Sequence, residues 1–591
     1  MPDSASSSAL PVRFYSDQLM IELSQHLIDK GLIDRAQAEE VKERARLTGG
    51  PLDRLLIKEG LVSEPDVLQA LSEVTHMPFR TLAHMDVNPA AVSRLPARAA
   101  FRYRAMPLEY RNGTLVMAVG HVPDLAMVDS VSLLVNSALE WILCPPSDIS
   151  QSLKHFYGLG VEALDDLIQT HADERVELEE TDLSTDAADP GVIKFINQVI
   201  HEAITMEATD IHWEPFENQM RLRYRIDGVL QNVPVPKGIQ KLRRAIVSSI
   251  KIMAQLNIAE RRKPHDGRIK AKFGKDEFDL RISVLPTRFG ETVAMRILNR
   301  KAMFISMQSL GVSPDQLEML QYLSDLPHGI VLITGPTGSG KTTTLYALLG
   351  RLNTHDVKII TAEDPVEYQM EGISQIQINP LIDLTFATIL RSILRHDPDI
   401  ILVGEIRDSE TADIAVRSSL TGHLVFSTLH TNDAPSSITR LIDMEIEPYL
   451  VSSCLEGVIA QRLVRRVCPS CREECSMDPV VLDEIAGFFP DRIAGAHFYK
   501  PRGCPNCNFT GYRGRVAIFE IMMMDDVIRS MVVHERPSNE IRNTAIEHGL
   551  ITLRQNGLSR VLDGVTTVEE VVRVARKFVP AASSQSSARS R

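Results

Sequence analysis

The sequence has no apolar run long enough to cross a membrane. Its most apolar stretches, such as Ile400 to Val403, are far shorter than the roughly 20 residues that a membrane-spanning helix needs. The start, Met1-Pro2-Asp3-Ser4, carries neither the basic nor the apolar segment of a secretory signal. Positive charge is also scarce: 64 Lys and Arg against 77 Asp and Glu give a net charge of −13, which excludes general attraction to nucleic acid. These absences predict a cytoplasmic protein without direct nucleic-acid contacts.

Cysteine is scarce too, and its odd number of seven does not suit a set of disulfides. Four of the seven form two C-x-x-C units, Cys468-Pro-Ser-Cys471 and Cys504-Pro-Asn-Cys507. Cys475 lies near enough to these units to compete as a metal ligand, whereas Cys144 and Cys454 are expected to be small buried apolar residues. Two C-x-x-C turns let four thiolates converge on one tetrahedral ion, which suits Zn²⁺. The predicted zinc ligands are Cys468, Cys471, Cys504 and Cys507.

With 591 residues, and roughly one domain per 150 residues, about four domains are expected. Composition and periodicity place two flexible tails at the ends, and an acidic linker with few aromatic residues between the second and third domains. The predicted regions are a tail (1–12), a helical domain (13–78), a small α/β subdomain (79–157), the linker (158–189), a first α/β domain (190–302), a second α/β domain (303–578) with an insertion at about 464–515, and a tail (579–591).

The helical domain contains an internal duplication. LSQHLIDKGLIDRAQ at 23–37 and LDRLLIKEGLVSEPD at 52–66 follow the same pattern of a helix, a glycine and a new helix start. Asp34 and Ser63 are the expected N-caps of the two second helices. We therefore expect two copies of one helical unit.

The second α/β domain contains a phosphate-binding loop. The apolar run GIVLIT at 329–334 predicts a buried strand, and the glycine-rich segment after it leads into a helical run, which is the context that this motif requires. Backbone N–H groups would hold the phosphates, Lys341 would pair with their oxygens, and the Thr342 hydroxyl would ligate Mg²⁺. The predicted ATP-binding residues are Gly335, Pro336, Thr337, Gly338, Ser339, Gly340, Lys341, Thr342 and Thr343.

Three further motifs each follow an apolar run. VKIITA leads into EDPVE, where Glu363 or Glu367 would orient a water molecule; IILVG leads to Glu405, in the place of a Mg²⁺-coordinating acid. HLVFSTLH begins at His423 and ends at His430. On one unbroken strand, an odd interval of seven places them on opposite faces, so they are not expected to form one ligand pair. His430, at the carboxyl end of the strand, is the better candidate to sense the γ-phosphate.

These motifs, in this order, resemble the type II secretion and type IV pilus-assembly ATPases. The resemblance covers about residues 190 to 575 and continues upstream in ATDIHWEP, RYRIDGVL and DGRI. It implies a multidomain α/β fold in which a RecA-like ATPase domain with a zinc-binding insertion follows a PAS-like α/β domain and a helical plus α/β N-terminal region. It also assigns Glu367 to water activation, Glu405 to the Walker B position, and His423 with His430 to the His box.

The resemblance further implies a homo-hexamer. Arg281 and Arg296, upstream of the loop, would complete a neighbouring subunit's ATP site, a role that suits the arginine side chain. Expected partners are inner-membrane platform and docking proteins, so the chain would lie at the inner face of the cytoplasmic membrane without entering it. The tetracysteine unit favours assembly over retraction.

The N-terminal module resembles one that binds cyclic di-GMP in part of this family, but neither copy supplies the Arg-Leu-Gly contact residues, with Arg54 as a possible substitute. Docking to a membrane partner is therefore the preferred use. Two other functions stay open: a related ATPase for DNA uptake or transfer, and a nucleotide-gated scaffold with little hydrolysis. Secretion and pilus assembly share every motif used here.

Overall fold

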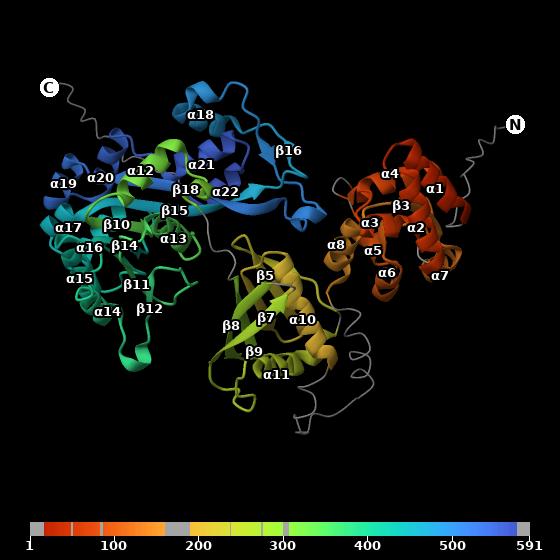
Figure 1. Cartoon of the computed structure of the whole chain (residues 1–591), viewed down its shortest axis with the longest axis horizontal. Helices are drawn as coiled ribbons and strands as arrows, with labels where there is room; N and C mark the ends of the chain where they lie inside the picture. The colour runs from red at the N-terminus through yellow and green to blue at the C-terminus, as the bar shows by residue number, and fades with distance from the viewer. Residues whose placement is uncertain are drawn as a thin grey trace, which may run out of the picture. The chain divides into compact units, whose positions relative to one another are not determined.

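The computed structural model describes residues 17–48, 51–82, 85, 87–159, 190–236, 238–273, 276–299 and 306–575 (Figure 1). Most of the predicted acidic linker and the whole of both predicted tails lie outside these residues. The described chain separates into two compact units, one formed mostly by residues up to 297 and the other mostly by residues from 298 onwards. No helix in the described ranges is at once long enough and apolar enough to span a membrane.

The predicted duplication is present as two consecutive helical hairpins. Asp34 Oδ1 accepts a hydrogen bond from Gln37 N at 2.8 Å, and Ser63 Oγ accepts one from Asp66 N at 3.4 Å, so both predicted N-caps are confirmed. Glycines at the preceding turns have φ of 68° and 69°, a conformation that favours glycine. The four helices are α1 (Asp17–Asp29), α2 (Arg35–Thr48), α3 (Leu52–Lys58) and α4 (Glu64–Thr75).

The two hairpins bury different polar side chains at one equivalent position. Ser24 is buried in the first, and its hydroxyl donates to Met20 O at 2.7 Å. Asp53 is buried in the second, with 2% of its surface exposed, and its Oδ1 has no hydrogen-bond partner among the described residues. Burial raises the pKa of this carboxyl group.

A small α/β region follows and shares one core with the hairpins. Its three strands lie in the order β1-β2-β3, with β1 antiparallel and β3 parallel to β2. Buried side chains from Leu19 through Leu153 form a single apolar cluster, so the two predicted N-terminal regions pack together. The elements are α5 (Pro89–Val92), α6 (Ala97–Tyr103), β1 (Ala105–Arg111), β2 (Thr114–Val119), α7 (Leu125–Val135), β3 (Ala138–Leu143) and α8 (Pro146–Tyr157).

The domain from residue 190 is a six-stranded sheet in the order β6-β5-β4-β9-β8-β7, with helices on one face (Figure 1). Strand residues alternate between buried and partly exposed, as the sequence predicts. The buried face packs on α10, where Phe195 meets Trp213 with ring centroids 5.8 Å apart. The elements are α10 (Pro190–Thr205), β4 (Asp210–Pro215), β5 (Met220–Ile226), β6 (Val229–Val233), η3 (Ile239–Leu242), α11 (Arg243–Met253), β7 (His265–Phe273), β8 (Asp276–Thr287) and β9 (Gly290–Asn299).

The second unit is built on a seven-stranded sheet in the order β12-β11-β13-β14-β10-β15-β18. All neighbours are parallel except β15 and β18, which are antiparallel. Strands β10, β13 and β14 are buried at every residue, which explains why their sequences are mostly apolar. The buried hydroxyls of Thr334, Ser427 and Thr428 donate to backbone oxygens. The strands are β10 (Gly329–Thr334), β11 (Ile359–Glu363), β12 (Ser374–Gln377), β13 (Ile400–Val403), β14 (Leu424–Leu429), β15 (Leu455–Val467) and β18 (Tyr512–Met523).

Helices cover both faces of this sheet, and the buried side chains form two apolar clusters. The sequence stretch between β15 and β18 is the predicted insertion. The helices of the sheet region are η4 (Met307–Leu310), α12 (Pro314–Ser324), α13 (Lys341–Leu352), η5 (Pro380–Ile382), α14 (Phe386–Ile393), α15 (Ser409–Leu420), α16 (Pro435–Asp443), α17 (Pro448–Cys454), α19 (Asp526–Val533), α20 (Ser538–Glu547), α21 (Leu553–Leu562) and α22 (Val568–Val574). The insertion contains β16 (Glu473–Glu474), α18 (Pro479–Phe488), η6 (Pro490–Arg492), β17 (Tyr499–Lys500) and η7 (Pro505–Cys507).

Candidate active site

The glycine-rich loop joins the end of β10 to the start of α13, as predicted. Its first residue, Gly335, lies so close to β15 that a Cβ atom there would stand 2.6 Å from Gln461 O. Ser339 is buried, and its hydroxyl has no hydrogen-bond partner among the described residues. An unpartnered buried hydroxyl in a loop of this shape fits a bound phosphate, which would accept its hydrogen bond.

Lys341 begins α13 and folds back over the loop. Its Nζ donates to Gly335 O at 2.7 Å and to Pro336 O at 3.3 Å. Burial lowers the pKa of Lys341 to about 8, the nearby carboxylate of Glu405 opposes this shift, and the cation of Arg462 adds to it. Thr342 is exposed and Thr343 is half-buried in the first turn of α13. The ammonium group is therefore poised beside the place where phosphates would bind.

Glu405 and His430 come together at the carboxyl edge of the parallel sheet. Glu405 follows β13, His430 follows β14, and their Oε2 and Nε2 atoms are 3.3 Å apart. Glu405 also forms an ion pair with Arg407, at 2.6 Å between Oε1 and Nη2. Because β10 is parallel to β14, the glycine-rich loop begins at this same edge.

His423 is not part of this cluster. It precedes β14, and its backbone oxygen accepts a hydrogen bond from Gly329 N, at the start of β10. Its Nδ1 atom lies 2.8 Å from Ser418 O. A six-residue strand spans about 20 Å, so the two predicted histidines lie at opposite ends of β14, and His430 is the one beside Glu405.

The two glutamates of EDPVE have contrasting surroundings. Glu363 is buried at the end of β11 and accepts hydrogen bonds from Tyr346, Thr361 and Gln375, the last two at 2.6 and 3.2 Å. Glu367 is exposed, and no side-chain hydrogen bond occupies it within the described chain. Glu363 therefore has little capacity left for a water molecule, whereas Glu367 is open to one.

Arg462 on β15 is a site residue that the sequence reasoning missed. Its buried guanidinium donates to Gln461 O at 2.9 Å on its own strand and to Asn432 O at 2.7 Å in the segment after His430. It also lies beside the glycine-rich loop, because a Cβ atom at Gly335 would stand 2.9 Å from Arg462 Nη1. Burial lowers the pKa of Arg462. The signal available in the sequence was the pair of polar residues Gln461 and Arg462, which interrupts the apolar run from Gly457 to Val464.

Arg281 and Arg296 lie on the partly exposed face of the middle-domain sheet. Arg296 Nε donates to Asp210 Oδ1 at 3.2 Å, and Arg281 Nε has no partner in the described part of the chain. Register places Arg268 beside Arg281, and Arg225 shares Asp210 with Arg296. The signals in the sequence were the alternating segment RLRYR, which ends at Arg225, and the motif DGRI, which contains Arg268.

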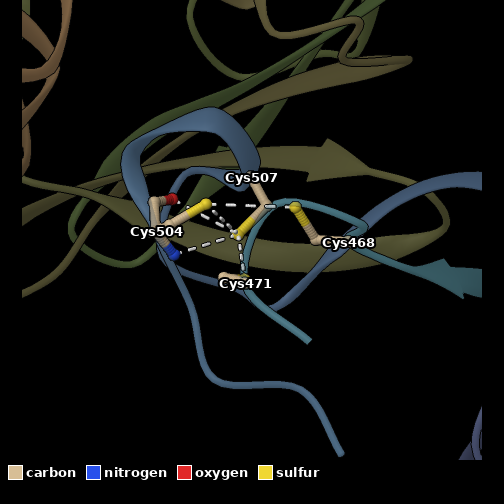
Figure 2. A group of neighbouring side chains, drawn as sticks. All are labelled: Cys468, Cys471, Cys504 and Cys507. Carbon is tan, nitrogen blue, oxygen red and sulfur yellow. Dashed lines mark hydrogen bonds between the residues drawn. The ribbon is translucent and has the colours of Figure 1, made fainter. Parts of the chain in front are cut away.

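The four predicted cysteine ligands form one buried cluster, shown in Figure 2. Sulfur–sulfur distances are 3.9 Å for Cys468 and Cys504, 3.8 Å for Cys471 and Cys507, and 3.7 Å for Cys504 and Cys507. A tetrahedral ion with metal–sulfur bonds of ~2.3 Å needs sulfur atoms about 3.8 Å apart. The side chains thus fit a tetrahedral metal ion.

The backbone around the cluster also suits thiolates. The N–H groups of Cys504 and Gly511 donate to Cys507 Sγ at 3.1 and 3.2 Å. The Cys504 thiol and these two N–H groups lower the pKa of Cys507 to about 5. Cys475 is outside the cluster, and Cys144 and Cys454 are buried as predicted.

Comparison with known proteins gives a consistent result. The family model described as type II/IV secretion system protein matches residues 185–573, and an MshEN domain model matches residues 75–163. The type IV pilus assembly ATPase PilB of Myxococcus xanthus is 42% identical over 557 residues, covering 93% of this chain and 98% of that protein. The type II secretion system protein E of Xanthomonas campestris is 43% identical over 535 residues, covering 89% and 93%. A crystal structure of the pilus retraction motor PilT with bound ADP is 26% identical, covers 65% of this chain and 97% of that one, and gives a TM-score of 0.44.

Proposed function

This chain belongs to the type II/IV secretion system protein family, whose members hydrolyse ATP, and we propose that its ATPase activity powers assembly of a pilus or pseudopilus. One observation carries the proposal: Lys341, Glu405 and His430 gather at one edge of a parallel sheet. The relatives that resemble nearly the whole chain are named for pilus assembly and for type II secretion, which supports assembly as the process that ATP hydrolysis powers.

In the proposed site, backbone N–H groups of the glycine-rich loop, the Ser339 hydroxyl and Lys341 bind the ATP phosphates. Thr342 and Glu405 would hold Mg²⁺, which would neutralise charge on the phosphates when bound. Glu367 orients the attacking water because, of the two glutamates in its motif, it is the exposed and unoccupied one. His430, beside Glu405, senses the γ-phosphate.

The proposed working form is a ring of six chains. Arg281 and Arg296 would reach a neighbouring subunit's ATP there and neutralise charge on the transferring phosphoryl group. Their place on the partly exposed face of the sheet supports this role, since a buried guanidinium could not leave its own chain. The ring would lie in the cytoplasm at the inner membrane, where the N-terminal region docks to a membrane partner and a platform protein receives the motion.

Substitutions at Glu363 and Glu367 test which of the two carboxylates addresses the attacking water. We expect the wild-type chain to hydrolyse ATP, and Glu367→Gln to lower kcat by about 100-fold or more with little change in melting temperature. Glu363→Gln should instead lower the melting temperature. The carboxylate accepts hydrogen bonds at both oxygens from three side-chain donors, and an amide replaces one oxygen with an NH₂ group that cannot accept. A buried donor that loses its acceptor costs about 1–3 kcal/mol. Steady-state kinetics and thermal unfolding measure the two effects.

A reversed result, with Glu363→Gln stable but inactive and Glu367→Gln fully active, would move the water-addressing role to Glu363. A wild-type chain without turnover would favour a nucleotide-gated scaffold. Strong stimulation by double-stranded DNA would favour the DNA-transport alternative.

We also propose that the four-cysteine cluster binds one Zn²⁺ with a structural role. Metal analysis of protein purified without chelators should find about one zinc per chain. Cys471→Ser should lose the metal and unfold at a lower temperature, because structural zinc sites contribute folding free energy. The control is Cys475→Ser, which changes a cysteine of the same insertion outside the cluster and should keep both metal and stability. Finding no metal in the wild type would refute this assignment.

A further inference from the structure

The domain between residues 190 and 299 contains a cavity that none of the proposed ATP-site residues lines. Its volume is about 530 Å³, and its walls come from the turn after β4, the turn between β8 and β9, and the start of α11. Sites for small ligands typically enclose about 300–1,000 Å³. The cavity is therefore large enough for a small molecule or the headgroup of a larger one.

Four arginines line this cavity: Arg243, Arg244, Arg261 and Arg288. Arg243 and Arg261 are half-buried, and the other two are exposed. Within the described residues, none of the four forms an ion pair with a carboxylate. Other arginines of the same domain do find partners, such as Arg223, which lies 2.5 Å from Glu214.

The two carboxylates in the lining do not balance these charges. Glu291 is already paired with the buried ammonium of Lys251, at 2.5 Å between Oε1 and Nζ. Glu217, which is exposed at the turn after β4, is then the one remaining carboxylate in the lining, against four arginines. In a chain with 77 acidic residues, such a local excess of positive charge is not a consequence of composition. Like charges around one cavity repel each other, and an anion bound between them would remove that cost.

The chemistry of the lining points to phosphate. Guanidinium groups donate paired N–H bonds that match phosphate oxygens, and they lose less hydration than ammonium groups do. Met220, Val247 and Phe289 add apolar wall, and the Arg288 guanidinium lies 5.6 Å from the centre of the Phe289 ring. The site thus combines several phosphate donors with a surface for a less polar portion of the ligand.

We propose that this cavity is a second anion site, which binds a phosphate-bearing small molecule or the phosphate headgroup of an acidic lipid. It is separate from ATP hydrolysis, since Arg281 and Arg296 are not among its lining residues. Failure of this proposal would leave the proposed motor function intact.

The test uses the full chain carrying Lys341→Ala, which weakens phosphate binding at the glycine-rich loop. Inorganic pyrophosphate is titrated into this protein by calorimetry, without and with the added pair Arg243→Gln and Arg288→Gln. The matched control is the pair Lys241→Gln and Lys270→Gln, which removes the same charge from exposed residues outside the cavity. We expect saturable binding that weakens by about tenfold for each guanidinium removed and is unchanged in the control.

A second arm identifies the source of the phosphate. The same proteins are mixed with phosphatidylcholine vesicles with and without phosphatidylglycerol, and bound protein is measured by flotation. Arginine-dependent binding to the acidic vesicles assigns the site to lipid headgroups, whereas arginine-dependent pyrophosphate binding alone assigns it to a soluble ligand.

Equal binding by the arginine variant and the control in both arms would overturn the proposal. So would a protein that binds neither pyrophosphate nor the acidic vesicles. If the arginine pair altered only the association of subunits, the arginines would face an acidic protein surface, and the anion site would be rejected.

Discussion

Lys341→Ala is expected to abolish measurable ATP turnover. Its ammonium group stands at the start of α13 and already lies over the loop carbonyls of Gly335 and Pro336. Removing one preorganised charge at a site of phosphoryl transfer costs about 100- to 1,000-fold in rate, and here it removes ATP affinity as well. Phosphate release and nucleotide binding measure the two losses. Lys500→Ala, at an exposed lysine of the insertion, should leave both unchanged.

The lowered pKa of Lys341 adds a pH signature to this prediction. Burial disfavours the charged amine in the free protein, so its contribution to stability improves as pH rises through about 8. Bound phosphate favours the charged form and raises the pKa again. ATP binding near pH 8 should therefore take up a proton and weaken at higher pH, as calorimetry in buffers of different ionisation enthalpy can measure. Wild-type turnover in Lys341→Ala, or binding without proton uptake in the native chain, would contradict this account of the site.

Glu405→Gln should produce a chain that binds ATP but hydrolyses it about 100- to 10,000-fold more slowly. The glutamine retains the size of the side chain and can still contact Arg407 and His430, which now lie 2.6 and 3.3 Å from the carboxylate. It removes the negative charge that would ligate Mg²⁺ and that partly offsets the depressed pKa of Lys341. Single-turnover hydrolysis and equilibrium nucleotide binding separate the rate effect from affinity.

The matched control for Glu405→Gln is Glu318→Gln on α12, an exposed change with the same chemistry. Turnover in Glu405→Gln equal to that of the control would remove Glu405 from the catalytic site. Loss of nucleotide binding with little change in hydrolysis per bound ATP would instead restrict its role to holding the metal and phosphates.

Sequence patterns predicted the parts of this fold that depend on burial of one short segment or on contacts between residues close in the chain. GIVLIT is buried on both faces of a parallel sheet, which requires side chains that are apolar or, like Thr334, hydrogen-bonded to backbone, and the prediction of β10 is confirmed over 329–334. The caps at Asp34 and Ser63 are confirmed because each depends on a hydrogen bond only three residues away. The cysteine cluster was readable because two short turns bring two ligands each.

Other features depend on residues distant in the sequence. Glu363 is occupied by Tyr346 and Gln375, which lie on other elements, so the sequence left it equal to Glu367. Arg462 reaches the glycine-rich loop only because β15 pairs with β10. The segment HLVFSTLH places His423 and His430 at the two ends of one strand, but it does not show that His430 lies beside Glu405, which follows another strand. Pairing between distant strands determines these cases, and one sequence contains no direct signal of it.

The paired hairpins at the N-terminus also differ in how they satisfy one buried polar side chain. Ser24 meets its hydrogen-bonding needs within its own helix, whereas Asp53 holds a buried carboxyl oxygen that has no partner among the described residues. A buried polar group in that state costs about 1–3 kcal/mol, which is a large share of the stability that a single small unit can have. One apolar core joins both hairpins, so burial over the whole region offsets the cost. The second hairpin therefore depends for its stability on the elements that pack against it.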